Sequence, residues 1–107
     1  MSSFAVMNNT KWKELQKAMY ELGESSPQWR TKCLTNGFIS AWDGEWYYHF
    51  SVGGFKDIEW VEIRAEDDEG KGVLLSELRK IHVPGVEIEN GCRVYGYIEE
   101  GKVVDYV

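Results

Sequence analysis

The stretch Trp42-Asp43-Gly44-Glu45-Trp46-Tyr47-Tyr48-His49-Phe50 decides how the middle of this chain is expected to fold, and five of its nine residues are aromatic. Asp43-Gly44 separates two runs that are typical of strands. An Asp-Gly pair favours a two-residue type I′ turn, because both residues tolerate positive φ. A loop of that length places Ala41 opposite Trp46, so we predict a tight hairpin here.

Side chains alternate between the two faces of such a hairpin. The face that we expect to be buried carries Ile39, Ala41, Trp46, Tyr48 and Phe50. The opposite face carries five candidate binding residues, namely Phe38, Trp42, Glu45, Tyr47 and His49. Tyr and Trp give a large contact area with few rotatable bonds, which suits a binding surface. The alternative is that a helix or the C-terminal strands cover this face.

Composition limits the kind of partner. The chain of 107 residues has the length of one domain, and its net charge is −6. That charge argues against nucleic acid as a partner and permits a basic protein partner. The alternative is that the acidic surface only keeps a cytosolic protein soluble. The N-terminus lacks the pattern of a signal peptide, and no apolar run is long enough to span a membrane. We therefore expect a cytoplasmic protein with Cys33 and Cys92 reduced.

Flanking segments predict two helices and several strands. After a loose arm at residues 1–8, a helix capped by Asn9 or Thr10 places the residues Trp12, Leu15, Met19 and Leu22 on one side. Residues 29–35 and 38–42 are typical of strands joined at Asn36-Gly37. A two-residue loop pairs Leu34 with Ile39, which puts Arg30 and Lys32 on the core face. Either this strand lies at an edge, or its register slips through a longer turn.

The second half of the chain continues this pattern. Residues 58–64 alternate as a strand, with Glu59, Val61 and Ile63 on one face and Ile58, Trp60 and Glu62 on the other. An acidic turn at 66–72 precedes a predicted helix at 73–81, followed by predicted strands at 86–88, 93–98 and 103–107. The whole chain, residues 1–107, is predicted to be a single α+β domain. Its antiparallel sheet, a meander of hairpins, packs against two helices.

Several blocks occur together in a fixed order: Asn9-Thr10-Lys11-Trp12, Asp43-Gly44-Glu45-Trp46-Tyr47-Tyr48-His49-Phe50, Ile58-Glu59-Trp60-Val61-Glu62-Ile63, Ile81-His82-Val83-Pro84-Gly85 and Arg93-Val94-Tyr95-Gly96-Tyr97. With these blocks the chain resembles a family of small bacterial domains of unknown function. The resemblance covers nearly the whole chain past Met7, and it implies a soluble bacterial protein of about this length. It transfers no catalytic residue.

Chemical motifs are weak. A histidine beside a carboxylate can act as a general base, and His49 and Glu45 share one face of the predicted strand. The spacing of His49, His82, Cys33 and Cys92 matches no zinc pattern, so we predict no metal, no cofactor and no catalytic residue.

The first functional hypothesis is therefore a non-enzymatic protein-binding domain, of an immunity or regulatory type. The alternative is a small enzyme or ligand-binding protein with its site around Glu45, Tyr47 and His49. A homodimer through the aromatic face or through residues 103–107 is a third hypothesis.

Overall fold

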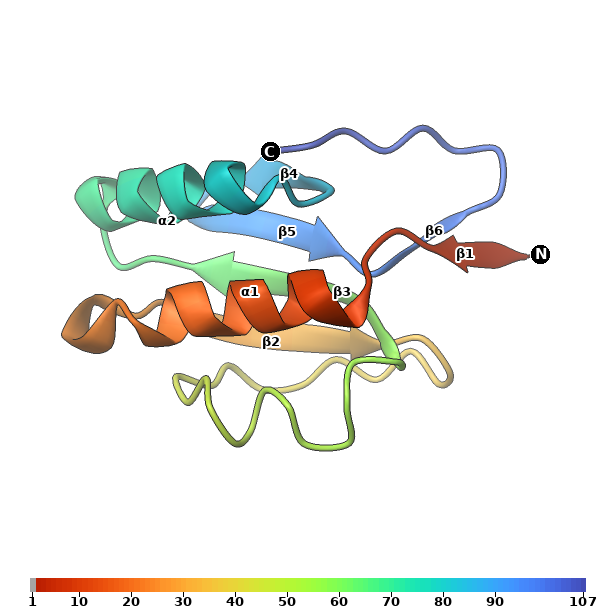
Figure 1. Cartoon of the computed structure of the whole chain (residues 1–107), viewed down its shortest axis with the longest axis horizontal. Helices are drawn as coiled ribbons and strands as arrows, with labels where there is room; N and C mark the ends of the chain where they lie inside the picture. The colour runs from red at the N-terminus through yellow and green to blue at the C-terminus, as the bar shows by residue number, and fades with distance from the viewer. Residues whose placement is uncertain (1) are drawn as a thin grey trace.

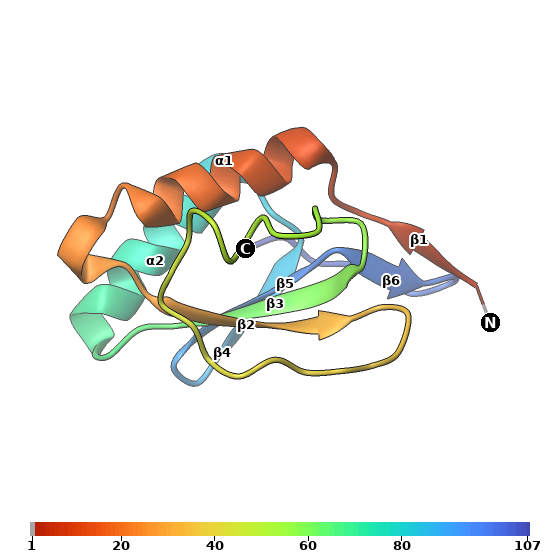
Figure 2. The same cartoon turned by 90° about the horizontal axis from the view of Figure 1, so that it is seen from below.

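The computed structural model, which describes residues 2–107, contains a four-stranded and a two-stranded antiparallel sheet. The larger sheet has the strand order β2-β3-β5-β4, and the smaller sheet pairs β1 with β6 (Figure 1). The strands are β1 Ser3–Ala5, β2 Gln28–Cys33, β3 Ile58–Arg64, β4 Gly85–Ile88, β5 Gly91–Tyr95 and β6 Tyr97–Glu99. Both helices, α1 (Asn9–Tyr20) and α2 (Asp68–Ile81), lie on the same side of the larger sheet (Figure 2). The predicted α+β class is confirmed.

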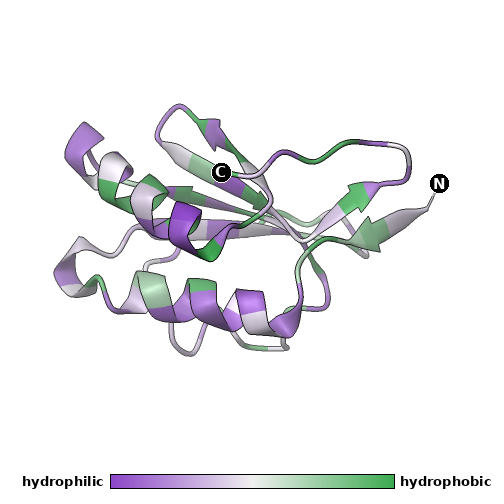
Figure 3. Ribbon diagram, turned by 45° about the horizontal axis from the view of Figure 1, so that its top comes forward, coloured by the Kyte–Doolittle hydropathy of each residue, from purple (hydrophilic) through white to green (hydrophobic). Residues whose placement is uncertain are grey.

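Each of the two helices begins at a side chain that accepts a hydrogen bond from a free backbone N–H group of the first turn. Asn8 accepts a hydrogen bond from the N–H of Lys11 at the start of α1. Asp67 does the same for Gly70, so α2 starts at Asp68. The sequence prediction of a turn over residues 66–72 was therefore wrong, because this cap outweighs the low helix propensity of the two glycines there. Hydrophobic and hydrophilic residues alternate along both helices (Figure 3).

The core lies between these helices and the larger sheet. In β3, Val61 and Ile63 belong to the buried cluster, whereas Trp60 and Glu62 point to the other face, as the alternation predicted. Ile58 was predicted on the face of Trp60 but belongs to the buried cluster, because the register between β2 and β3 shifts where Cys33 pairs with Ile58. The predicted stripe of α1 is buried at Trp12, Leu15 and Met19. Burying one such apolar side chain stabilises the fold by about 1.5–3 kcal/mol, so this stripe contributes to holding α1 on the sheet.

Two terminal segments differ from simple strands. The predicted strand 93–98 is divided at Gly96, where a Cβ atom would lie only 2.1 Å from the carbonyl oxygen of Ile58. Residues 103–107 form no strand, because Tyr106 makes only an isolated bridge to Pro84. Within the N-terminal arm, β1 pairs with β6, and the second sheet holds this part of the arm.

The predicted hairpin at Asp43-Gly44 does not form. Asp43 instead exchanges two backbone hydrogen bonds of 2.8 Å with Trp29 of β2, and the following residues coil back toward α1 (Figure 2). Further along, Lys32 pairs with Ile39, rather than Leu34 with Ile39. This shifted register places Trp29 in the core and turns the side chain of Arg30 to the face away from the helices, which resolves the conflict in the sequence prediction.

Neither helix of residues 2–107 combines the length and apolar character that a membrane crossing needs.

Candidate functional site

A tight turn after Glu45 shapes the aromatic segment. The Glu45 carboxylate accepts hydrogen bonds from the backbone N–H groups of Tyr47, Tyr48 and His49 at 3.1, 2.6 and 2.8 Å. Successive amides that converge on one carboxylate cannot pair with a neighbouring strand, which is the physical reason why no hairpin forms. The turn separates the side chains in a new way: Trp46 and Phe50 are buried, while Tyr47, Tyr48 and His49 are exposed.

Hydrogen bonds fix this turn to the rest of the domain. The indole N–H of Trp46 donates to the carbonyl of Pro27 at 2.8 Å, and that of Trp29 donates to the carbonyl of Glu45 at 2.9 Å. From α1, the Gln16 side-chain amide donates to the carbonyls of Trp46 and Tyr47 at 2.8 and 2.7 Å. The exposed residues of the turn are therefore held in place by buried anchors.

Three exposed tyrosines form what we call the tyrosine patch, defined by Tyr20, Tyr47 and Tyr48. Their side chains are 55%, 53% and 70% exposed. The ring centroids of Tyr20 and Tyr47 are 5.5 Å apart, and those of Tyr47 and Tyr48 are 4.8 Å apart. The sequence prediction placed Tyr48 in the core and did not include Tyr20. The available signal for Tyr20 was that it falls outside the buried stripe of α1.

Two carboxylates adjoin the tyrosine patch. The Glu45 carboxylate lies under the turn, where the N–H groups of His49, Tyr48 and Tyr47 hold its pKa below the usual value. Asp43 accepts a hydrogen bond from the N–H of Glu45, and its second oxygen lies 2.8 Å from Nδ1 of His49. Although burial raises it, these bonds hold the pKa of Asp43 below its ordinary value. Both groups therefore stay negatively charged near neutral pH.

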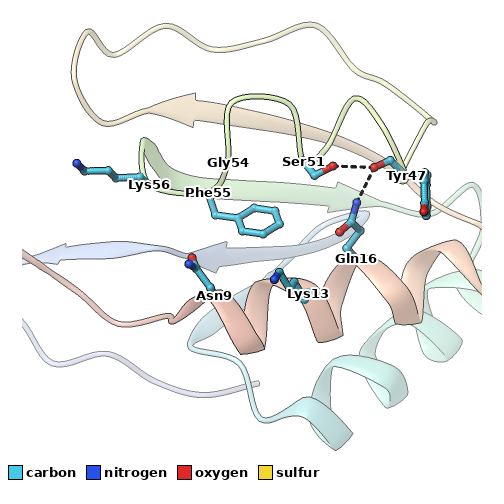
Figure 4. A pocket seen from close by; sticks show the side chains of 8 residues that line it. All are labelled: Asn9, Lys13, Gln16, Tyr47, Ser51, Gly54, Phe55 and Lys56. Carbon is cyan, nitrogen blue, oxygen red and sulfur yellow. Dashed lines mark hydrogen bonds between the residues drawn. The ribbon is translucent and has the colours of Figure 1, made fainter.

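A groove of about 580 Å³ continues from Tyr47 along α1 (Figure 4). The lining residues are Asn9, Lys13, Gln16, Tyr47, Ser51, Gly54, Phe55 and Lys56. Phe55 forms a buried apolar wall and stacks on Trp12, with ring centroids 5.8 Å apart. Two lysines line the groove and no acidic residue does, so its charge is opposite to that of Asp43 and Glu45.

The five candidate binding residues do not share one face. Glu45, Tyr47 and His49 belong to the turn at the tyrosine patch, and the ring of His49 also contacts Asp43. Trp42 lies against the guanidinium groups of two arginines on the open side of the larger sheet. Phe38 is 66% exposed and follows the turn at the end of β2, where its carbonyl accepts from the N–H of Cys33.

The geometry around His49 differs from the one that the enzyme hypothesis requires, in which His49 is paired with Glu45. His49 pairs with Asp43 rather than with Glu45, whose carboxylate is occupied by three backbone N–H groups. The groove that Tyr47 lines includes neither Glu45 nor His49. Within residues 2–107, no group of three or more His, Cys, Asp or Glu side chains is placed to hold a metal ion.

Comparison with protein families gives one match. The model of a family described as a family of unknown function, DUF6678, matches residues 1–101. No match was found among curated proteins or among solved structures.

Proposed function

We propose that this chain, which belongs to the family of unknown function DUF6678, is a non-enzymatic domain that binds a basic protein segment through the tyrosine patch. The observation that supports this role is the exposed contact between Tyr20, Tyr47 and Tyr48 on a turn with buried anchors. Tyrosines are enriched at binding hot spots, and a fixed turn reduces the entropy lost on binding.

Charge supports a basic partner. Asp43 and Glu45 stay ionised beside the tyrosines, and the whole chain carries a net charge of −6. A Lys or Arg side chain of the partner can pair with these carboxylates and lie over a tyrosine ring. Lys13 and Lys56 would repel the same side chain, so the contact is expected on the carboxylate side of Tyr47. A domain that covers a basic partner in this way would act as an immunity-type or regulatory factor.

Site-specific photocrosslinking in the cells that encode the protein tests this role. A photoreactive phenylalanine analogue replaces Tyr48, and the matched control carries it at Tyr106, an exposed tyrosine that bridges to Pro84. We expect one basic protein to be crosslinked from position 48 and not from position 106.

The purified partner then gives the decisive binding data. Tyr47→Ala and Tyr48→Ala are expected to weaken its binding by about tenfold or more each, since hot-spot truncations cost about 2 kcal/mol or more. Tyr106→Ala should leave the affinity unchanged, and higher salt should slow association. Equal binding by all three variants would overturn the proposal.

A further inference from the structure

The larger sheet has a second face, which neither α1 nor α2 covers (Figure 2). The side chains that strand alternation directs to this face include four cations, namely Arg30, Lys32, Arg64 and Arg93. Three of the four arginines of the chain are therefore on this face. We call it the arginine face and define it by Arg30, Arg64 and Arg93. In an acidic protein, such a concentration of cations on one surface points to a negatively charged ligand.

Glu62 organises two of these arginines from the centre of the sheet. Its side chain is buried, and Oε1 accepts a hydrogen bond from Nε of Arg30 at 2.8 Å and lies 2.7 Å from Nη2 of the same residue in an ion pair. The other oxygen accepts from Nε and Nη2 of Arg93 at 3.0 and 2.6 Å. One carboxylate thus orients two guanidinium groups, and it balances only one of their two positive charges.

Tryptophan rings contact all three residues of the arginine face. The guanidinium carbon of Arg93 lies 4.5 Å from the ring centroid of Trp60. Those of Arg30 and Arg64 lie 4.7 and 4.0 Å from the ring of Trp42. Stacking and hydrogen bonding together restrict these long side chains, so little rotamer entropy is left to lose when an anion binds.

Within the described residues Arg64 forms no direct ion pair with a carboxylate, although Glu24, Glu66, Asp67 and Glu69 line the same surface pocket. Nε and Nη2 of Arg64 both donate to the neutral amide oxygen of Gln28, at 3.0 and 2.8 Å. Arg64 also shares the Trp42 ring with Arg30, so two positive charges lie close together. In both arginines, Nη1 has no hydrogen-bond partner among residues 2–107. An incoming carboxylate would relieve this repulsion and receive fixed donors.

We propose that the arginine face binds an acidic polypeptide segment, rich in Asp or Glu, of a partner protein. Its donors are guanidinium groups in fixed orientations, which match carboxylates. Single-stranded nucleic acid is disfavoured because its bases need free aromatic rings, and the rings of Trp42 and Trp60 are occupied by guanidinium groups. This surface is distinct from the tyrosine patch, and it takes a ligand of the opposite charge.

Titration of the purified protein with three probes tests the proposal. The probes are a short peptide of alternating glutamate and glycine, its glutamine counterpart, and an oligothymidine of equal charge. Binding is followed by tryptophan fluorescence and by the NMR signals of the arginine Nε–H groups. We expect the glutamate peptide to bind in a salt-dependent manner and to shift the signals of Arg30 and Arg64. Binding of the glutamine peptide with equal affinity, or binding of the oligothymidine alone, would overturn the proposal.

Matched variants locate the site. Arg64→Gln is expected to weaken binding of the glutamate peptide by about tenfold, in line with the loss of a charge-assisted hydrogen bond. Arg79→Gln removes the same charge from the exposed side of α2 and should change the affinity by less than about twofold. Equal losses in both variants would mean a non-specific charge effect and would refute the site. Among residues 2–107, the hydrogen bonds of Arg64 go to the exposed Gln28, and its guanidinium lies on the ring of Trp42. The variant is therefore expected to stay folded, as far-UV circular dichroism can verify.

Discussion

Replacing Glu62 by glutamine tests whether one buried carboxylate holds the arginine face together. The carboxylate accepts hydrogen bonds from Nε of Arg30 and from Nε and Nη2 of Arg93, it forms an ion pair with both arginines, and the side chain of Glu62 is only 6% exposed. Breaking a fully buried ion pair costs about 3–5 kcal/mol, whereas an exposed pair contributes about 0–1 kcal/mol. The two arginine side chains are 36% and 35% exposed, so solvent screens part of the interaction. We therefore expect Glu62→Gln to lower the free energy of unfolding by about 2–3 kcal/mol.

The pH dependence of this loss shows whether it comes from removing the negative charge of Glu62 or from a change in side-chain packing. Burial raises the pKa of Glu62, but hydrogen bonds from Arg93 and Arg30 outweigh it and hold the folded-state pKa below 4.5. A carboxyl with a depressed folded-state pKa stabilises the protein above its unfolded-state pKa, and this contribution disappears as the pH falls through the folded-state value. The difference in the free energy of unfolding between wild type and Glu62→Gln should therefore be largest near neutral pH and should decrease as the pH falls below 4.5.

Urea unfolding followed by circular dichroism measures both quantities. Glu14→Gln is the control, because Glu14 is exposed on α1, and it should change the free energy of unfolding by less than about 0.5 kcal/mol. A loss below about 1 kcal/mol for Glu62→Gln near neutral pH would refute the reasoning. So would a loss of the same size at every pH.

Three further predictions concern the turn, the sheet and the thiols. Trp46→Ala should lower the free energy of unfolding by about 3–5 kcal/mol, because the ring is 2% exposed and its N–H bonds to Pro27, while Tyr48→Ala should change it little in the same urea experiment. Gly91→Ala should be strongly destabilising, since its Cβ would lie 1.8 Å from the carbonyl oxygen of Ile63, whereas Gly44→Ala has open space and should be nearly neutral; melting temperatures distinguish the two. A thiol reagent at mildly alkaline pH should label Cys33 in the native protein and Cys92 only after unfolding, because burial raises the pKa of the Cys92 thiol to about 12; rapid labelling of native Cys92 would contradict this.

The regular elements were predictable where side-chain periodicity was clear, although α1 is capped by Asn8 rather than by Asn9 or Thr10. The alternation of residues 58–64 predicted the bounds of β3 and the faces of Val61 and Ile63, but it placed Ile58 on the wrong face. The spacing of Trp12, Leu15 and Met19 predicted α1. The start of α2 was missed because Asp67 stands in a run of acidic residues and only the structure identifies it as the cap. Local patterns were sufficient when no side chain competed for the backbone.

The aromatic segment shows where such patterns fail. Asp43-Gly44 is a good hairpin signal, yet the Glu45 carboxylate binds three backbone N–H groups and Asp43 pairs with Trp29. The burial of Trp46 and Phe50 was predicted correctly, but the segment was predicted as a strand and forms a turn. Two residues spaced by four can point to the same side in either backbone conformation. The arginine face was missed because strand alternation places its members together only once the register of β2 is known.

The most direct test of the protein-binding role is the affinity of the crosslinked partner for Tyr47→Ala, compared with wild type and with Tyr106→Ala, measured by calorimetry. The tyrosine patch predicts a loss of about tenfold or more for Tyr47→Ala and none for Tyr106→Ala. Unchanged affinity in the folded Tyr47→Ala variant would contradict the assignment of this surface.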